Sequence, residues 1–79
     1  MHEVSIAQAL LRQVDEVVSR HRLTTVSAVG ICVGSLSGVG PEALAFAFQV
    51  LRGGPTAGAA LQVRATDGAD LRLEWIEGE

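Results

Sequence analysis

The chain has 79 residues, which is enough for one domain and too few for two. It carries nine acidic and six basic residues, a net charge of −3, and its scattered arginines exclude the basic patch of a nucleic-acid-binding protein. Its single cysteine excludes a disulfide framework and a cysteine-rich zinc site. No signal-peptide pattern and no membrane-length apolar run occurs, so we expect a cytoplasmic protein without a membrane partner.

The first residues place a histidine beside an amino terminus. The large residue at position 2 predicts that Met1 is retained, so that the α-amine belongs to Met1. This amine has a pKa near 8 (about two units below lysine) and yields its proton to a metal readily. The Met1 amine, the His2 backbone nitrogen and the His2 imidazole can chelate one ion, and such nitrogens favour Ni(II) or Cu(II). Glu3 can add a carboxylate or a second backbone nitrogen. The alternative is that His2 is an exposed residue at a frayed end.

An amphipathic helix is predicted from Ser5 to about Arg22. Ser5 and Gln8 have the spacing of a capping box at its start. Val4, just before the cap, is either the apolar partner of a hydrophobic staple or part of a short first strand. The residues that recur at three- and four-residue steps on the apolar side are Ile6, Leu10, Val14, Val17 and His21.

Residues 23–34 change from a helical to an alternating period, which predicts a strand. One face is apolar and the other is lined by the small residues Ala28, Gly30 and Cys32. Cys32 is interpreted as a small hydrophobic residue of that second face. An open face of small residues, or a long exposed strand edge, favours a homodimer.

The glycine- and serine-rich residues 34–40 lead into Pro41. Such loops can cradle phosphate, but the lysine of a P-loop is missing, so we interpret the segment as a turn. Pro41 suits the first position of a second helix, which residues 53–55 (GGP) terminate. Phe48 lies on the apolar stripe of this helix and is predicted to be in the core, whereas Phe46 is predicted to face an edge or a partner.

Two further strands are predicted at residues 61–65 and 71–75, and Asp67-Gly68 between them is typical of a short hairpin. The expected order is β-α-β-α-β-β, with two helices packed on one face of a small mixed sheet. The fold class is therefore α/β, in the form of a two-layer α+β domain covering residues 1–79.

Several stretches, taken in order, resemble the HypA/HybF family. They are residues 1–5 (MHEVS), 33–39 (VGSLSGV), 41–48 (PEALAFAF), 52–53 (RG), 58–63 (GAALQV) and 71–79 (LRLEWIEGE). The resemblance implies a metallochaperone that delivers Ni(II) during maturation of [NiFe]-hydrogenase or urease. It implies His2 as the principal nickel ligand, with the Met1 amine and Glu3 beside it. The implied partners are the maturation GTPase of the nickel pathway and the hydrogenase large subunit.

The sequence departs from the family in one large feature and one small one. The family carries a zinc-binding insertion with two paired-cysteine motifs between its last two strands, and here a short turn near residues 66–70 stands in its place. We therefore expect no zinc site. Gly40 occupies a position before the proline where the family often has an acidic residue.

Two other functions remain open alternatives. The chain can be a metal-free interaction module that keeps the family's docking surface, in which case Phe46 and the outer face of the first helix matter and His2 does not. An enzyme is not expected, because His21, Ser35 and Ser37 form no arrangement of nucleophile, base and oxyanion donors.

Overall fold

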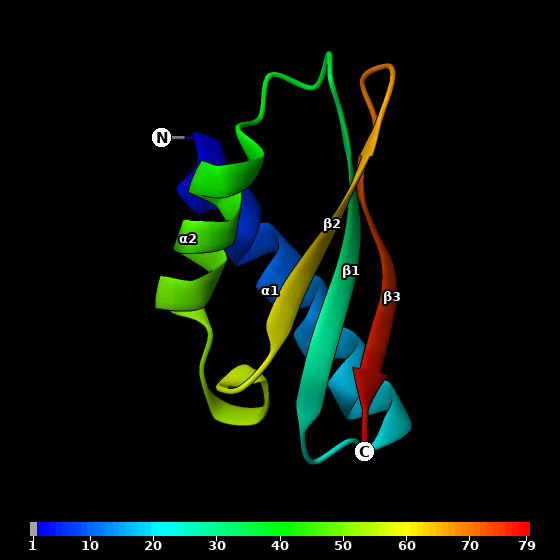
Figure 1. Ribbon diagram of the computed structural model, residues 1–79. Helices are drawn as coiled ribbons and strands as arrows, with labels where there is room; N and C mark the ends of the chain where they lie inside the picture. Colours follow the sequence, from blue (N-terminus) through cyan, green and yellow to red (C-terminus); the bar gives the residue numbers. More distant parts are fainter. Residues whose placement is uncertain (1) are drawn as a thin grey trace.

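The computed structural model describes the backbone of residues 2–79 and the side chains of residues 3–79. Both helices pack on the same face of a three-stranded sheet (Figure 1). This arrangement confirms the predicted two-layer α+β class with a small mixed sheet. The elements in chain order are α1 (His2–His21), β1 (Val26–Gly34), α2 (Pro41–Leu51), a short 3₁₀ turn (Gly54–Thr56), β2 (Ala60–Thr66) and β3 (Leu71–Gly78).

Helix α1 begins three residues earlier than the predicted cap at Ser5. Val4 therefore lies in the first turn of α1, and no strand precedes this helix in the part of the chain that the structure describes. Contacts with the rest of the fold hold this turn, because Val4 packs against the hydrophobic core and the Glu3 side chain reaches the start of α2. These contacts replace the local capping box that the sequence predicts at Ser5.

Strand β1 is the centre of the sheet, with the order β2-β1-β3. It pairs in parallel with β2 and antiparallel with β3. The predicted hairpin between the last two strands is therefore wrong, because β1 lies between them. Residues 67–70 cross the end of β1. There the Gly34 amide donates to the Asp70 carbonyl, and the amide of Leu36, just beyond the strand, donates to the Gly68 carbonyl. Gly68 supplies the positive φ of 99° that this crossing requires.

The two faces of β1 have different neighbours. Val29, Ile31 and Val33 face the core beneath the helices and are buried, as the alternating pattern predicts. The face lined by small residues is not open to solvent either. A Cβ atom on Gly30 would lie 2.1 Å from the indole Cε2 of Trp75, so this glycine lets the ring lie against the strand. A homodimer through that face is therefore not supported.

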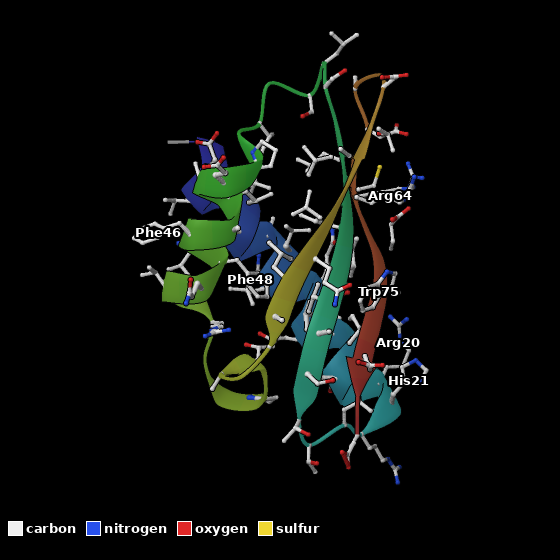
Figure 2. The ribbon with its side chains drawn as sticks, viewed as in Figure 1. Arg20, His21, Phe46, Phe48, Arg64 and Trp75 are labelled. Atoms are coloured by element: carbon white, nitrogen blue, oxygen red, sulfur yellow. The ribbon has the colours of Figure 1, made fainter. Side chains whose placement is uncertain are left out.

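Helix α2 separates its two phenylalanines as predicted. Phe48 is 1% exposed and packs in the core, whereas 69% of Phe46 is exposed on the opposite side of the helix (Figure 2). Pro41 is the first helical residue, and the Arg52 amide donates to the Phe48 carbonyl at the far end. Among the described residues, no helix is both long and apolar enough to span a membrane.

Candidate metal site at the start of α1

The predicted nickel ligands come from the first turn of α1. Met1 and the side chain of His2 lie outside the described residues, and the backbone of His2 is helical. Glu3 is the one predicted ligand whose side chain can be placed. Among the described side chains, no group of three or more histidine, cysteine, aspartate or glutamate residues is arranged to hold a metal. The ligand set Met1, His2 and Glu3 therefore stays a prediction.

Glu3 connects the two helices at this end of the molecule. Its Oε2 accepts a hydrogen bond from the Gly40 amide, with an N–O distance of 3.2 Å. Gly40 is the residue before α2, and it has no side chain with which to cap that helix. The positive end of the helix dipole favours a carboxylate at this place by about 0.3–1 kcal/mol. Glu3 thus fixes the first turn of α1 beside the start of α2, a role that the sequence does not reveal.

Replacing Glu3 separates this structural role from a ligand role. Glu3→Ala removes the acceptor of the Gly40 amide and is expected to lower the free energy of unfolding by about 1 kcal/mol. Glu3→Gln keeps an amide oxygen as acceptor and is expected to lose less. Urea unfolding followed by the fluorescence of Trp75 measures both values. Equal losses in the two variants would contradict the hydrogen-bonding role and point to the charge itself.

The other residues considered for chemistry lie in structural positions. His21 is the exposed last residue of α1, about 30 Å along the helix from its start. Cys32 is fully buried, and its Sγ lies 3.4 Å from the Thr66 hydroxyl, as suits a small core residue. The Ser37 hydroxyl accepts from the Val39 amide, which confirms a turn in the glycine-rich segment.

An apolar groove lies directly beside Glu3, between the first turn of α1 and α2. Its most exposed side chains are Phe46, Val50 and Leu51. The orientation of Phe46 away from the core was predictable, and Leu51 also lines this groove. The groove-lining residues are Glu3, Val4, Ala43, Phe46, Ala47, Val50 and Leu51.

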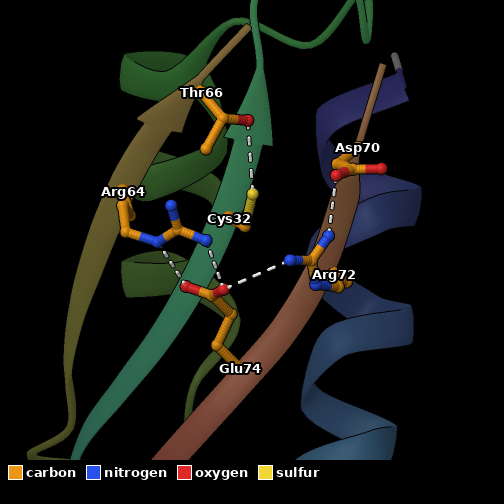
Figure 3. A network of polar contacts seen from close by, with 6 residues as sticks. All are labelled: Cys32, Arg64, Thr66, Asp70, Arg72 and Glu74. Carbon is orange, nitrogen blue, oxygen red and sulfur yellow. Dashed lines mark hydrogen bonds and ion pairs between the residues drawn. The ribbon is translucent and has the colours of Figure 1, made fainter. Parts of the chain in front are cut away.

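A charged network covers the sheet face opposite the helices (Figure 3). Glu74 accepts two hydrogen bonds from Arg64, at 2.9 and 2.6 Å, and lies 3.6 Å from an Arg72 nitrogen. Arg72 also pairs with Asp70 at 2.8 Å. The register between β1 and β3 shifts here, and Glu74 is the additional residue on β3. This shift places the Glu74 carboxylate between the two arginines. The network joins both edge strands across β1, and the sequence alone did not predict it.

The network makes stability depend on pH. The hydrogen bond from Arg64 lowers the pKa of Glu74 below its usual 4.5; burial opposes this shift, and the charges of Arg64 and Arg72 reinforce it. Because the pKa of Glu74 is lower in the folded state than in the unfolded state, its ionised form stabilises the fold at pH values above the unfolded-state pKa. This stabilisation is lost as the pH falls through the folded-state pKa. Native protein is therefore expected to melt at a higher temperature than Glu74→Gln at pH 7, with the difference vanishing in acid.

Thermal unfolding between pH 7 and pH 3 measures this difference. Glu16→Gln, on the exposed side of α1, provides the matched control, because it removes the same charge at a residue outside this network. If the native protein kept its whole advantage over Glu74→Gln at the acidic end, the ion pair would not be its source.

Comparison with known proteins places these features in a family. Residues 1–77 match the model of the HypA family, described as "Hydrogenase/urease nickel incorporation, metallochaperone, hypA". The hydrogenase maturation factor HypA of Dechloromonas aromatica is 40% identical over 78 residues, covering 98% of this chain and 69% of that protein. The same factor of Deinococcus radiodurans is 44% identical over 69 residues, covering 86% of this chain and 58% of that protein. The chain thus spans about two thirds of the length of such relatives.

A solved structure shows the same fold. The solution structure of the Ni metallochaperone HypA from Helicobacter pylori superimposes with a TM-score of 0.87 at 15% identity. The superposition covers 96% of each chain. This likeness independently confirms the arrangement of helices and strands described above.

Proposed function

The chain belongs to the HypA family, and from this premise we propose that it binds Ni(II) and assists its insertion into [NiFe]-hydrogenase or urease. The family match from residue 1 to residue 77 carries this proposal, since it includes the initial Met-His-Glu. The proposed ligands are the Met1 amine, the backbone nitrogen and imidazole of His2, and Glu3. The proposed setting is the cytoplasm, with no zinc site.

The start of a helix suits a backbone nitrogen ligand. The first four amides of an α-helix have no carbonyl partner within the helix. His2 lies in this first turn, so its amide nitrogen can bind Ni(II) without breaking a helical hydrogen bond. The contact between Glu3 and Gly40 supports the same site, because it ties the turn to α2 next to the terminal segment.

The same ligand set favours a carrier over a catalyst. An amine with a pKa near 8 (about that of a free terminus) and an imidazole with a pKa near 6.5 (again about the free value) both compete with protons near neutral pH. Mild acid or a competing ligand can therefore release the ion, which is what delivery to another protein requires. The proposed recipients are the maturation GTPase of the pathway and the hydrogenase large subunit.

Hydrogenase maturation in cells tests the carrier function. In a bacterium that lacks its own HypA protein, the native chain is expected to restore hydrogenase activity, whereas His2→Ala is not. His21→Ala is the matched control, because it removes the other histidine and leaves the start of α1 intact. Restoration by His2→Ala at the native level would contradict a nickel-carrying role.

The apolar groove favours a second candidate function, a metal-free interaction module that docks on the maturation GTPase. Phe46 and Val50 are 69% and 64% exposed and line the same groove, and contiguous exposed apolar surface of this kind marks interaction sites. Phe46→Asp is then expected to abolish co-purification with the GTPase, and His2→Ala to leave it unchanged. Loss of docking in His2→Ala alone would contradict this second candidate.

A further inference from the structure

Strand β3 forms one edge of the sheet, and no other described strand pairs with its outer side. The last turns of α1 pass behind β3 and emerge beyond that edge (Figure 1). A cleft of about 450 Å³ lies between the end of this helix and the strand. The apolar residues that line it are Val17, Leu23, Leu73 and Ile76. The cleft lies where a further strand, added to the sheet at β3, would pack on α1.

The part of β3 beside the cleft is regular enough to pair with a short strand. The two register shifts against β1 leave an extra residue at Glu74 on β3 and at Ser27 on β1. Residues 75–78 of β3 therefore contain no extra residue of their own. An edge strand of this kind presents unpaired backbone donors and acceptors. The extra residue at Glu74 ends the regular segment, so only a short extended segment fits here.

Positive charge lies on the helix side of the cleft. Arg20, His21 and Arg22 follow one another at the end of α1, and all three are exposed. His21 lines the cleft, and Arg20 lies next to it beside β3 (Figure 2). The ion pairs of the described residues include neither Arg20 nor Arg22. Two guanidinium groups are therefore available to a ligand at this end of the helix.

The carboxylates of β3 next to the cleft are directed toward the middle of the sheet. Glu74 lines the cleft, but its carboxylate accepts two hydrogen bonds from Arg64 on the far strand (Figure 3). The Glu77 carboxylate accepts from the Ser27 hydroxyl of β1 at 3.4 Å. Neither side chain therefore neutralises the arginines at the end of α1.

Arg22 occupies a backbone position that favours glycine. Its φ is 56°, in the left-handed region. The Leu23 amide donates to the Val18 carbonyl at 2.9 Å, so α1 ends in a turn of the Schellman type. Glycine adopts this conformation at the lowest cost. The chain thus carries an exposed guanidinium where the backbone alone would favour no side chain.

We propose that this cleft docks an extended, acidic segment of another protein, which adds to the edge of β3 as a fourth strand. The backbone of the segment pairs with residues 75–78, and one of its apolar side chains enters the cleft. Its carboxylates bind Arg20 and Arg22, since these are the unpaired charges beside the cleft. The docking site lies at the opposite end of α1 from the proposed nickel ligands, so it does not depend on the nickel function.

Titration of metal-free protein with short capped peptides tests the proposal. In the first peptide aspartate and valine alternate with threonine; in the second, lysine replaces aspartate; in the third, proline replaces threonine and removes backbone donors. The first peptide is expected to change the fluorescence of Trp75, which lines the cleft, and to shift the NMR signals of the amides in residues 17–23 and 75–78. Equal binding of the second or third peptide would overturn the proposal. So would no binding of the first at millimolar concentration, or the same shifts on concentrating the protein without peptide.

Three variants locate the binding of the first peptide. Arg20→Ala and Arg22→Gly are each expected to weaken it about threefold, and the double variant about tenfold. Arg22→Gly is expected to unfold at no lower temperature than the native chain, because glycine suits the left-handed position, so its weaker binding is not a folding defect. Arg12→Ala removes an exposed arginine from the middle of α1 and is the matched control. A loss in Arg12→Ala as large as that in Arg20→Ala would show that net charge, and not the cleft, attracts the peptide.

Discussion

Replacing His2 by alanine is expected to lower the affinity for Ni(II) by about 100-fold or more, which corresponds to ~2.8 kcal/mol. The imidazole is the one proposed ligand that cannot be replaced by a neighbouring group, because the only other histidine lies at the far end of α1. The Met1 amine and backbone nitrogens remain in the variant, so weak residual binding is expected. Isothermal titration calorimetry of native and variant protein, at pH 7.5 and without a tag before Met1, measures the change.

His21→Ala is the matched control for this experiment. It also replaces an α1 histidine by the best helix-forming residue, so its effect on the helix itself is comparable. Its Ni(II) affinity is expected to equal that of the native chain. A loss of affinity in His21→Ala as large as that in His2→Ala would show that the ion does not bind at the start of α1.

Replacing Phe48 by alanine is expected to lower the free energy of unfolding by about 3–5 kcal/mol. Phe48 is the largest fully buried side chain and lies between α2 and the sheet. A domain of this length has a total stability of only ~4–12 kcal/mol, so the variant will be close to unfolding at room temperature. Urea denaturation followed by the fluorescence of Trp75 measures the loss.

Phe46→Ala removes the same atoms from the other side of the same helix. Because Phe46 is mostly exposed, the change is expected to stay within about 0.5 kcal/mol. Equal losses in the two variants would contradict the exposed position of Phe46.

Helices and strands were predictable where a single local sequence pattern determines their position. The alternation around Ile31 predicted a strand with one apolar face, and the step from Gly40 to Pro41 predicted the start of α2. The positions of Phe46 and Phe48 followed from helical periodicity alone. The first turn of α1 was not predictable in this way, because a contact between Glu3 and a residue 37 positions later holds it.

The strand order was not predictable from the turn residues. Asp67-Gly68 is typical of a hairpin, but the pairing partners of β2 and β3 are both in β1, and burial of the apolar β1 in the centre of the sheet outweighs the local turn preference. The network around Glu74 depends on that order, since it brings Arg64 and Arg72 from the two outer strands across β1 (Figure 3).

The predicted nickel site was accessible from the sequence because it needs only neighbours in the chain. Met1, His2 and Glu3 supply their ligands from adjacent residues, so no tertiary arrangement has to be known to propose them. The structure adds the place of Glu3 beside α2 and the apolar groove next to it. Neither could be predicted from the order of residues, since both depend on how α1 crosses α2.

A nickel titration of two forms of the chain tests the central claim most directly. One form begins at Met1 and the other carries two extra residues before it, which moves the free amine away from His2 and changes no other residue. We expect the extended form to bind Ni(II) at least about 100-fold more weakly at pH 7.5, with a loss of the absorption bands of a nitrogen-ligated, square-planar ion. Equal affinity and identical spectra in the two forms would contradict binding through the amino terminus.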